Sequence, residues 1–390
     1  MKKTFFTIKK LIRILSQTIK SDVINKLVTT LCFISTYTDN SQFNIIFVAP
    51  SSSGKTYIPS EIANLFPKED IRKLGYSSAT AFFHDHEKYN KEKNIYYVDL
   101  ERKILIFLDQ SHSHLAERLR PVLSHDEKKL ELRITDKNKN QGLRTKRIIV
   151  IGFPSAIFCT ANAKIDEQET TRFILLSPEI NPKKIEKGIR LTLLREHDQK
   201  AFDDRLKSNS LRKALIKRIR AIRSAHITQI KIHDHTKIED WFFKKYKHLK
   251  PRHLRDIKIV MYIIQSLALL NFPFRKREGS VIWTTDSDVS KGLKLYEKIS
   301  LSQEIGLPPY IYNLYKEVIL PLYIKTHAKL TRKQILNKHF EVYGRALSEW
   351  QFNRDILPAL ERAGLVIQEP DPNDRRRTLI VPIKGINNIN

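Results

Sequence analysis

The sequence predicts an α/β fold with a parallel sheet, a helical region after it and a C-terminal module of helices followed by two strands. Three observations support this prediction. A short apolar run, residues 45–48, leads through a loop of small residues into a helix-like segment that reaches Leu65. A second apolar run, residues 104–108, ends directly in an aspartate. Near the end of the chain, three helical segments precede two short strands. Continuous apolar runs are typical of parallel strands, because both faces of such a sheet are covered.

The chain has 390 residues, enough for two or three domains and a sizeable core. Hydrophobic residues make up 41% of it, which is normal for a globular protein and excludes disorder throughout. The formal net charge of +28 favours a polyanionic partner. A charge kept for solubility, or a coding bias towards lysine, is the alternative explanation for part of this excess.

The cysteines and the apolar runs indicate where the protein works. Cys32 and Cys159 both lie in apolar contexts and are interpreted as core residues in a reducing compartment. No Cys/His cluster has zinc spacing. No apolar run is long enough to span a bilayer, and the basic start lacks the apolar region of a signal peptide. These features predict a cytoplasmic protein without a membrane partner.

Residues 44–56 have the order of a phosphate-binding loop: strand, small-residue loop, helix start. Small residues let backbone N–H groups curl around phosphate oxygens. Lys55 brings a positive charge to the outer phosphates, and the Thr56 hydroxyl helps to hold Mg²⁺. Ala49 stands where the usual pattern has glycine, so the loop must turn there without a left-handed residue. A Ser/Pro-rich surface turn is the alternative. The residues expected to bind ATP are Ser51, Ser52, Ser53, Gly54, Lys55 and Thr56.

Asp109 ends the second apolar run and is predicted to lie at the carboxyl end of a strand next to the first strand. A carboxylate placed there holds Mg²⁺ together with Thr56. The next residue is Gln110, where many ATPases have a glutamate that acts as the base. Glutamine orients a water molecule but takes no proton from it. Hydrolysis is therefore slow, or Glu117 supplies the base, or Asp109 does both tasks.

Residues 130–135 and 144–151 alternate like strands around a polar turn, which predicts a β-hairpin. Its basic side chains are candidates for contacts with a nucleic-acid backbone, with a merely solvated hairpin as the alternative. These candidates are Arg133, Lys137, Lys139, Arg144, Lys146 and Arg147.

Two more apolar runs complete the predicted sheet. Residues 154–161 predict a buried strand that ends in Asn162, whose amide can reach the γ-phosphate or the attacking water. Arg172 stands just before another apolar run, residues 173–176. Further on, residues 205–223 predict one helix with an apolar seam and a very basic outer face. That face either follows DNA or is only solvated.

The order of these motifs resembles the AAA+ ATPases. It is most similar to the branch with a hairpin before the first sensor, as in minichromosome maintenance helicases, viral superfamily 3 helicases and helicase-like ATPases of mobile elements. The resemblance spans roughly residues 19–272 and departs from the family pattern at Ala49 and Gln110. The motifs that carry it are the phosphate loop, Asp109, the basic hairpin, Asn162 and Arg172.

The resemblance implies roles for several polar residues. Asn162 matches the sensor residue, and Arg172 matches the arginine finger that one subunit contributes to its neighbour's ATP. Residues 251–270 resemble the family's lid helix, where Arg252, or else Arg255, contacts the γ-phosphate. A site completed by a neighbour implies a head-to-tail ring, which would be a homo-hexamer.

Residues 310–324, 331–343 and 348–363 are predicted helices, followed by two strands joined by a basic loop over residues 370–377. This order resembles a winged helix, whose third helix enters the major groove of DNA and whose loop contacts the backbone. Many winged helices bind protein instead, but three consecutive arginines favour DNA. The candidates are Gln351, Asn353 and Arg354 on the helix and Arg375, Arg376 and Arg377 in the loop.

The sequence thus predicts an N-terminal helical segment (1–40), an AAA+ nucleotide-binding core with a hairpin insert (41–180), a helical lid and connector (181–305) and a winged-helix domain (306–390). The leading hypothesis is a ring-forming, ATP-driven helicase or translocase that acts on single-stranded or forked DNA during replication of a mobile or viral element. The alternative is a DNA-binding initiator, loader or transposition regulator that uses ATP as an assembly switch. A purely structural DNA-binding protein is less favoured, because the residues of a working nucleotide site are present.

Overall fold

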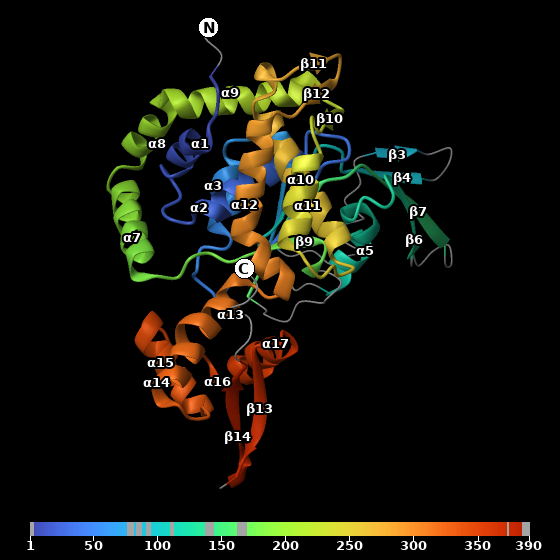
Figure 1. The fold of residues 1–390 in the computed structure, drawn as a ribbon. Helices are drawn as coiled ribbons and strands as arrows, with labels where there is room; N and C mark the ends of the chain where they lie inside the picture. The colour runs from blue at the N-terminus through green and yellow to red at the C-terminus, as the bar shows by residue number, and fades with distance from the viewer. Residues whose placement is uncertain are drawn as a thin grey trace.

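The computed structural model describes residues 4–75, 82, 88–90, 95–109, 113–136, 144–161, 170–372 and 374–383. Five of the described strands form one parallel sheet, which confirms the predicted α/β fold (Figure 1). They are β1 (Asn44–Val48), β2 (Ile71–Leu74), β5 (Ile104–Phe107), β8 (Ser155–Thr160) and β9 (Phe173–Leu176). Their order in the sheet is β2-β5-β8-β1-β9.

Side chains of the central strands alternate between two cores, one on each face of the sheet. Ile45 and Phe47 of β1 belong to a core shared with helices on one face, whereas Ile46 and Val48 belong to the core on the other face. Because both faces are covered, β1, β5, β8 and β9 are buried throughout and apolar almost throughout. The first face is covered by α1 (Ile8–Leu15), α2 (Val23–Ser35), α3 (Tyr57–Ala63), α11 (His253–Leu270) and α12 (Asp286–Ile305).

The strand order corrects one prediction. β8 pairs with both β1 and β5, so the strands that carry the phosphate loop and Asp109 are not adjacent. All three strands are parallel, so their carboxyl ends still lie at one edge of the sheet. After β1 the chain forms β2 at the far edge of the sheet, then β5, and then β8 next to β1. It finally forms β9 on the other side of β1. Ligands of open α/β sheets bind at such a switch point.

A second sheet, in the order β3-β4-β7-β6, contains the predicted hairpin. β6 (Lys129–Asp136) and β7 (Arg144–Ile151) pair antiparallel from Lys129 opposite Ile151 to Asp136 opposite Arg144. β4 (Ile95–Asp99) pairs parallel with β7, and β3 (Lys88–Asn90) flanks β4. The hairpin projects from the body of the protein (Figure 1). Helix α5 (Ser113–Leu123) connects this region to the second core.

Three helices follow the sheet along the outside of the molecule (Figure 1). α7 (Pro182–His197) and α8 (Gln199–Ser208) lie on the left of the view, and α9 (Ser210–Ala225) crosses the top. The single helix predicted over residues 205–223 is wrong, because the Asn209 side chain accepts a bond of 2.9 Å from the Arg212 N–H and starts a new helix. The apolar seam is confirmed at Leu215 and Ile219. The prediction that the basic side chains lie on the outer face is wrong for Arg212 and Arg218, because both are buried.

Helices α11 and α12 pack closely against each other beside the sheet. A Cβ atom at Gly292 would lie 2.3 Å from Ile264 Cγ1, so only glycine permits this approach. α12 begins with a capping box between Thr285 and Asp288. Asp288 also holds Arg275 in a buried two-bond ion pair. The small elements between α9 and α12 are β10 (Gln229–Lys231), α10 (Thr236–Lys245), β11 (Arg277–Glu278) and β12 (Val281–Trp283).

The C-terminal module has its own hydrophobic core, and its order of elements agrees with the prediction (Figure 1). Two of its helical segments widen into π turns, at Tyr315–Ile319 and Phe352–Ile356, just before Pro321 and Pro358. Proline lacks an N–H and crowds the preceding turn, which favours this widening. The elements are α13 (Pro309–Leu314), α14 (Leu320–Thr326), α15 (Arg332–Tyr343), α16 (Glu349–Gln351), α17 (Leu357–Arg362), β13 (Val366–Asp371) and β14 (Asp374–Pro382).

The predicted basic loop of this module is shorter than expected. β13 continues to Asp371 and β14 already begins at Asp374, so Arg375, Arg376 and Arg377 lie on a strand and not in a loop. The two strands extend away from the core of the protein (Figure 1). Across the described residues, no helix is both long and apolar enough to cross a membrane.

We expect mild acid to destabilise the fold through His125, which follows α5 and contacts the rings of Phe153 and Tyr262. Burial, with help from Lys258, lowers the pKa of its imidazole to about 4. In the unfolded state the imidazole has a pKa near 6.5, so between these two pKa values the unfolded state binds more protons than the folded state. The free energy of unfolding therefore falls as the pH falls through this range. From pH 7 to pH 5 this one group contributes a loss of about 2 kcal/mol, measurable by urea denaturation.

The matched variant is His125→Asn, because asparagine tolerates the left-handed backbone of this position (φ 58°). It should be less stable at pH 7 but lose less stability between pH 7 and pH 5. An unchanged pH dependence in the variant would show that another group titrates.

Candidate nucleotide-binding site

The phosphate loop lies between the end of β1 and the start of α3. Ala49 continues the sheet, since its N–H donates to Thr160 O at 3.2 Å. The left-handed positions fall instead at Ser52 (φ 62°) and Gly54 (φ 91°), so the loop turns without a left-handed residue at Ala49, as predicted. α3 begins at Tyr57, and it ends at Ala63, two residues before the predicted end.

Two hydroxyl groups in the loop lack protein partners among the described residues. Ser53 Oγ is buried without a hydrogen bond. Thr56 stands at the N-terminus of α3, and its side chain makes no capping bond there. A buried hydroxyl without a partner is costly, and a phosphate oxygen would satisfy it. The donors in this loop therefore fit a bound phosphate chain, with Thr56 free to contact a metal ion.

Lys55 and Asp109 both influence the Cys159 thiol, although their strands are not neighbours. The Cys159 thiol, on the intervening β8, donates to Lys55 O at 3.4 Å. Burial raises the pKa of this thiol to about 12, the Lys55 charge lowers it and the Asp109 carboxylate raises it. Both charged groups thus act on one buried sulfur at the carboxyl edge of the sheet. Asp109 is exposed there, and its N–H bonds to Gly75 O beyond the end of β2.

Lys184, which no sequence motif marks, joins α7 to the phosphate loop. Its ammonium donates to Ser53 O at 3.1 Å and forms an ion pair of 2.6 Å with buried Asp22. A cavity of about 270 Å³ lies beside this contact, between the segment that precedes α2, the loop and α7. It opens against Gly54 and Tyr57 and is lined mainly by apolar surface, which suits a flat ring attached to a phosphate chain.

The C-terminal module also reaches the phosphate loop. Arg345, just after α15, donates from Nη1 to Ser51 O at 3.0 Å. A cavity of about 260 Å³ lies between this module and the loop, and Gln351 is one of its lining residues. Gln351 therefore faces the core of the protein, where it is badly placed to enter a DNA groove. Arg354 stacks over exposed Trp350, with 4.9 Å between guanidinium carbon and ring centre.

The predicted finger and lid arginines gather at a different place. Arg172 donates to Ser124 Oγ at 2.7 Å, and neighbouring Thr171 accepts a bond from Arg255. Arg252 is held in a two-bond pair with Asp256, at 2.9 and 3.2 Å. Thr171, Arg252 and Arg255 line a cavity of about 940 Å³, and no phosphate-loop residue is among its described lining residues. The structure therefore separates these arginines from the Lys55 of the same chain.

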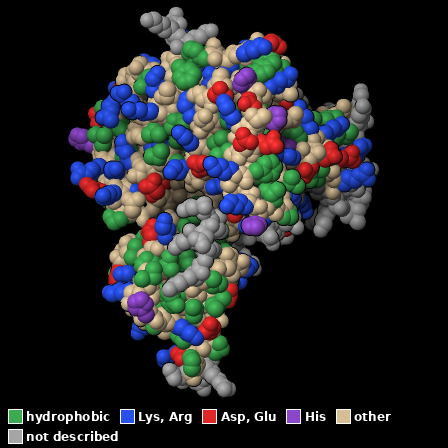
Figure 2. All heavy atoms as spheres, in the orientation of Figure 1, with side chains coloured by type: hydrophobic (Ala, Val, Ile, Leu, Met, Phe, Trp, Pro, Cys, Tyr) green, Lys and Arg blue, Asp and Glu red, His purple; other side chains and the backbone are tan. Residues whose placement is uncertain are grey.

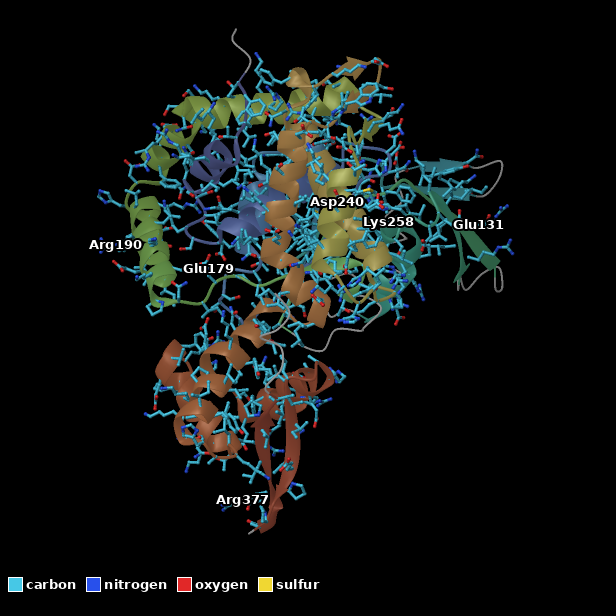
Figure 3. The ribbon with its side chains drawn as sticks, in the orientation of Figure 1. Glu131, Glu179, Arg190, Asp240, Lys258 and Arg377 are labelled. Atoms are coloured by element: carbon cyan, nitrogen blue, oxygen red, sulfur yellow. The ribbon has the colours of Figure 1, made fainter. Side chains whose placement is uncertain are left out.

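Acidic neighbours reduce the positive charge of the hairpin. Glu131 accepts two bonds from Arg147, at 3.0 and 2.9 Å, and one from Arg133, at 3.2 Å. These bonds hold the pKa of Glu131 at about 2. Figure 3 labels Glu131 on the hairpin, and Figure 2 shows acidic side chains interspersed with basic ones over it. Glu131 thus neutralises part of the positive charge of Arg133 and Arg147.

Several predicted residues lie outside the described parts of the chain. Nothing of Gln110, Asn162, Lys137 or Lys139 is described, and only the backbone of β7 and β14 is described at Arg144, Lys146, Arg375 and Arg376. Arg377 lies near the far tip of the C-terminal strands and pairs with Asp374 at 3.2 Å (Figure 3). Among the described residues, no three His, Cys, Asp or Glu side chains form a group able to hold a metal.

The comparisons with known proteins concern the fold alone. No family model matches this chain, and no curated protein matches it by sequence. Among solved structures it is similar to a full-length MCM homologue from Methanopyrus kandleri, with a TM-score of 0.45 and 11% sequence identity. The match covers 75% of this chain and spans 58% of the length of that homologue.

Proposed function

We propose that this chain is an ATPase of the AAA+ type that assembles head to tail and acts on DNA as a helicase or translocase. The observation that carries this proposal is the environment of Cys159 at the switch point of a parallel sheet. Its thiol donates to the Lys55 carbonyl, and the charges of Lys55 and Asp109 both act on it. Lys55 binds the outer phosphates of ATP, and Thr56 and Asp109 hold Mg²⁺. The ion neutralises charge on the phosphates during transfer to water.

The same chain does not bring its arginines to this site, which favours a neighbour as their target. Arg252 and Arg255 line a cavity that has no phosphate-loop residue among its described lining residues. Arg172 directly follows Thr171 of the same lining, so we place the ATP that these arginines contact on a second copy. A cation delivered to the γ-phosphate stabilises the charge that spreads during phosphoryl transfer. Head-to-tail contacts of this kind close into rings.

Exposed apolar side chains beside the phosphate loop and beside the arginine-lined cavity support docking between copies. Ile185, Ile189 and Leu193 recur along one face of α7, next to the Lys184 contact with the loop, and are 52%, 55% and 64% exposed. Leu254, between Arg252 and Arg255, is 75% exposed. Apolar patches of this kind on a soluble surface mark interaction sites. Docking of one patch on the other would bring the arginines to the neighbour's phosphate loop.

A switch that assembles on DNA without unwinding it is the second candidate. Gln110 replaces the usual catalytic base, and Arg345 ties the C-terminal module to the phosphate loop. A nucleotide that displaces the Arg345 contact would release the module, so binding alone could change the shape of the protein. Slow hydrolysis suits this role better than it suits a translocase.

Strand displacement separates the two functions. The full-length protein, ATP and Mg²⁺ are mixed with a forked duplex whose strands carry a fluorophore and a quencher. A helicase is expected to release the labelled strand in an ATP-dependent reaction that the Lys55→Ala variant does not perform. DNA-stimulated ATP turnover without any strand release would contradict the helicase and leave the switch as the function.

A further inference from the structure

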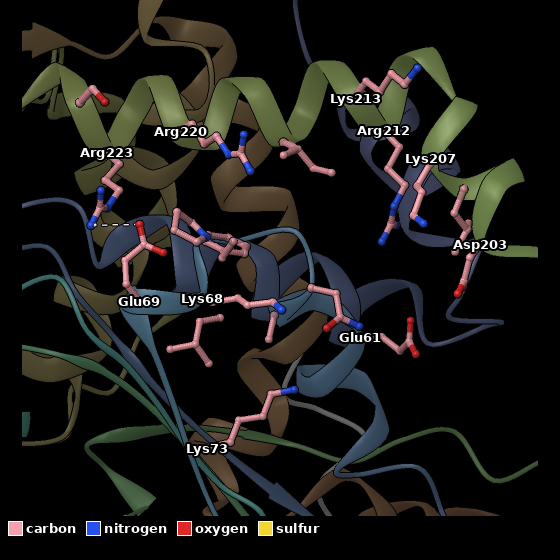
Figure 4. A pocket seen from close by; sticks show the side chains of 18 of the residues that line it. Glu61, Lys68, Glu69, Lys73, Asp203, Lys207, Arg212, Lys213, Arg220 and Arg223 are labelled. Carbon is pink, nitrogen blue, oxygen red and sulfur yellow. Dashed lines mark ion pairs between the residues drawn. The ribbon is translucent and has the colours of Figure 1, made fainter. Parts of the chain in front are cut away.

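A large basic cavity has no residue of the phosphate loop or of the C-terminal module among its described lining residues, and it shares only Arg195 of these with the smaller cavity beside the loop. It has a volume of about 1330 Å³. Helices α8 and α9 form one wall, and the end of α3, the turn Lys68–Asp70 and the edge strand β2 form the other (Figure 4). In Figure 1, α9 lies at the end of the molecule opposite the C-terminal strands. The hairpin contributes none of the described lining residues of the cavity.

Cations outnumber acids around this cavity. Its acidic lining residues are Glu61, Glu69 and Asp203, and its basic lining residues are Lys68, Lys73, Arg195, Lys207, Arg212, Lys213, Arg220 and Arg223. Each acid already has a partner. Arg195 donates two bonds of 3.2 Å to Glu61, Arg223 lies 3.5 Å from Glu69, and Gln199 donates to Asp203 at 3.0 Å. Lys207 lies 3.9 Å from Asp204, and no ion pair within the described residues holds Lys68, Lys73, Arg212, Lys213 or Arg220.

Arg212 is the strongest sign that an anion belongs there. It is 8% exposed, yet its guanidinium has no ion pair or hydrogen bond among the described residues. Burial lowers the pKa of this guanidinium, and the nearby Glu61 carboxylate opposes that effect only in part. Figure 4 shows the side chain directed from α9 into the cavity. An anion bound beside this largely buried guanidinium would offset the cost of its desolvation.

We propose that this cavity binds the sugar–phosphate backbone of a nucleic acid, with Arg212 and Arg220 on one wall and Lys68 and Lys73 on the other. Long cationic side chains on both walls match a chain of regularly spaced phosphates. An acidic protein fits less well, because protein interfaces need an aromatic or apolar centre and Phe66 is the one aromatic residue among the described lining residues. The site needs neither ATP nor the hairpin, so it stands apart from the nucleotide-dependent part of the proposed function.

The test uses the full-length protein without nucleotide and a fluorescein-labelled single-stranded DNA, with affinity measured by anisotropy from low to moderate salt. A double variant with the substitutions Lys73→Gln and Arg220→Gln removes one exposed cation from each wall of the cavity. If both contact phosphates, the slope of log affinity against log salt concentration falls by about 1.4. The matched control is Lys294→Gln with Lys298→Gln, two exposed lysines of α12 outside the cavity, which should leave the slope unchanged.

Arg212→Met tests the buried cation separately. Methionine fills the space without a charge, so the melting temperature should stay the same or rise, while DNA affinity falls about tenfold. A lower melting temperature with unchanged DNA affinity would show that Arg212 is structural, and the proposal would be wrong.

Two further outcomes overturn the proposal. Equal salt slopes for the cavity variant and its control would place the DNA contacts elsewhere and leave the cavity to an acidic protein. No DNA binding at all, with ATP binding intact by a separate titration, would refute the nucleic-acid partner but not the nucleotide site. Loss of ATP binding in the Lys55→Ala variant with unchanged DNA affinity would show that the two sites are independent.

Discussion

Replacing Lys55 with alanine is expected to weaken ATP binding about 100-fold, which corresponds to roughly 3 kcal/mol, a large value for a bond to a charged group. The physical reason is the placement of the side chain. Lys55 lies in a loop with a buried, unpaired Ser53 hydroxyl, and its charge acts on the same thiol as that of Asp109. Its loss removes the one loop cation from the outer phosphates. Titration of a fluorescent ATP analogue with Mg²⁺ measures the effect.

Two controls make this result specific. Lys298→Ala removes an exposed lysine of α12 and should leave ATP affinity unchanged. Lys184→Ala removes a contact with Ser53 O and leaves Asp22 without its ion pair, so it should reduce affinity less than Lys55→Ala and also lower the melting temperature. If Lys55→Ala binds ATP as tightly as the unchanged protein, the loop is not a nucleotide site and the proposed function is lost with it.

The sequence predicted those features that depend on neighbours along the chain. The strands were recognisable because runs such as residues 104–107 are buried on both faces and therefore apolar throughout. The hairpin followed from alternation, and the start of α15 followed from Thr331 as an N-cap, which Gln334 completes to a capping box. The absence of a left-handed residue at Ala49 followed from its side chain, and the loop has its left-handed residues at Ser52 and Gly54 instead.

Contacts between distant segments could not be predicted in the same way. β8 lies between β1 and β5 because of the path of the chain through the sheet, and no local pattern encodes that path. Lys184 and Arg345 touch the phosphate loop from far along the sequence, and each is one cation among many in a chain with a net charge of +28. Arg212 was expected on an outer basic face, either along DNA or in solvent, because helical spacing gives the direction of a side chain but not what covers it.

The arginine finger can be tested by mixing two inactive variants. Arg172→Ala alone is expected to lower ATP turnover about a thousandfold or more in the assembled protein, a usual loss for an arginine finger. Lys55→Ala alone should also be inactive. In a random equal mixture, a competent site needs Lys55 from one subunit and Arg172 from the next, so roughly one site in four should work. Turnover would then recover to about a quarter of the unchanged value.

The mixture distinguishes a neighbour's arginine from one that acts within its own subunit. If Arg172 served its own chain, no subunit in the mixture would hold both residues, and turnover would stay at the level of the single variants. Arg13→Ala, an exposed arginine of α1, is the matched control and should keep full turnover. The separation of Arg172, Arg252 and Arg255 from the phosphate loop favours recovery. Because Leu254 lies among these arginines, Leu254→Asp should prevent both assembly and recovery while leaving ATP binding by the single chain intact.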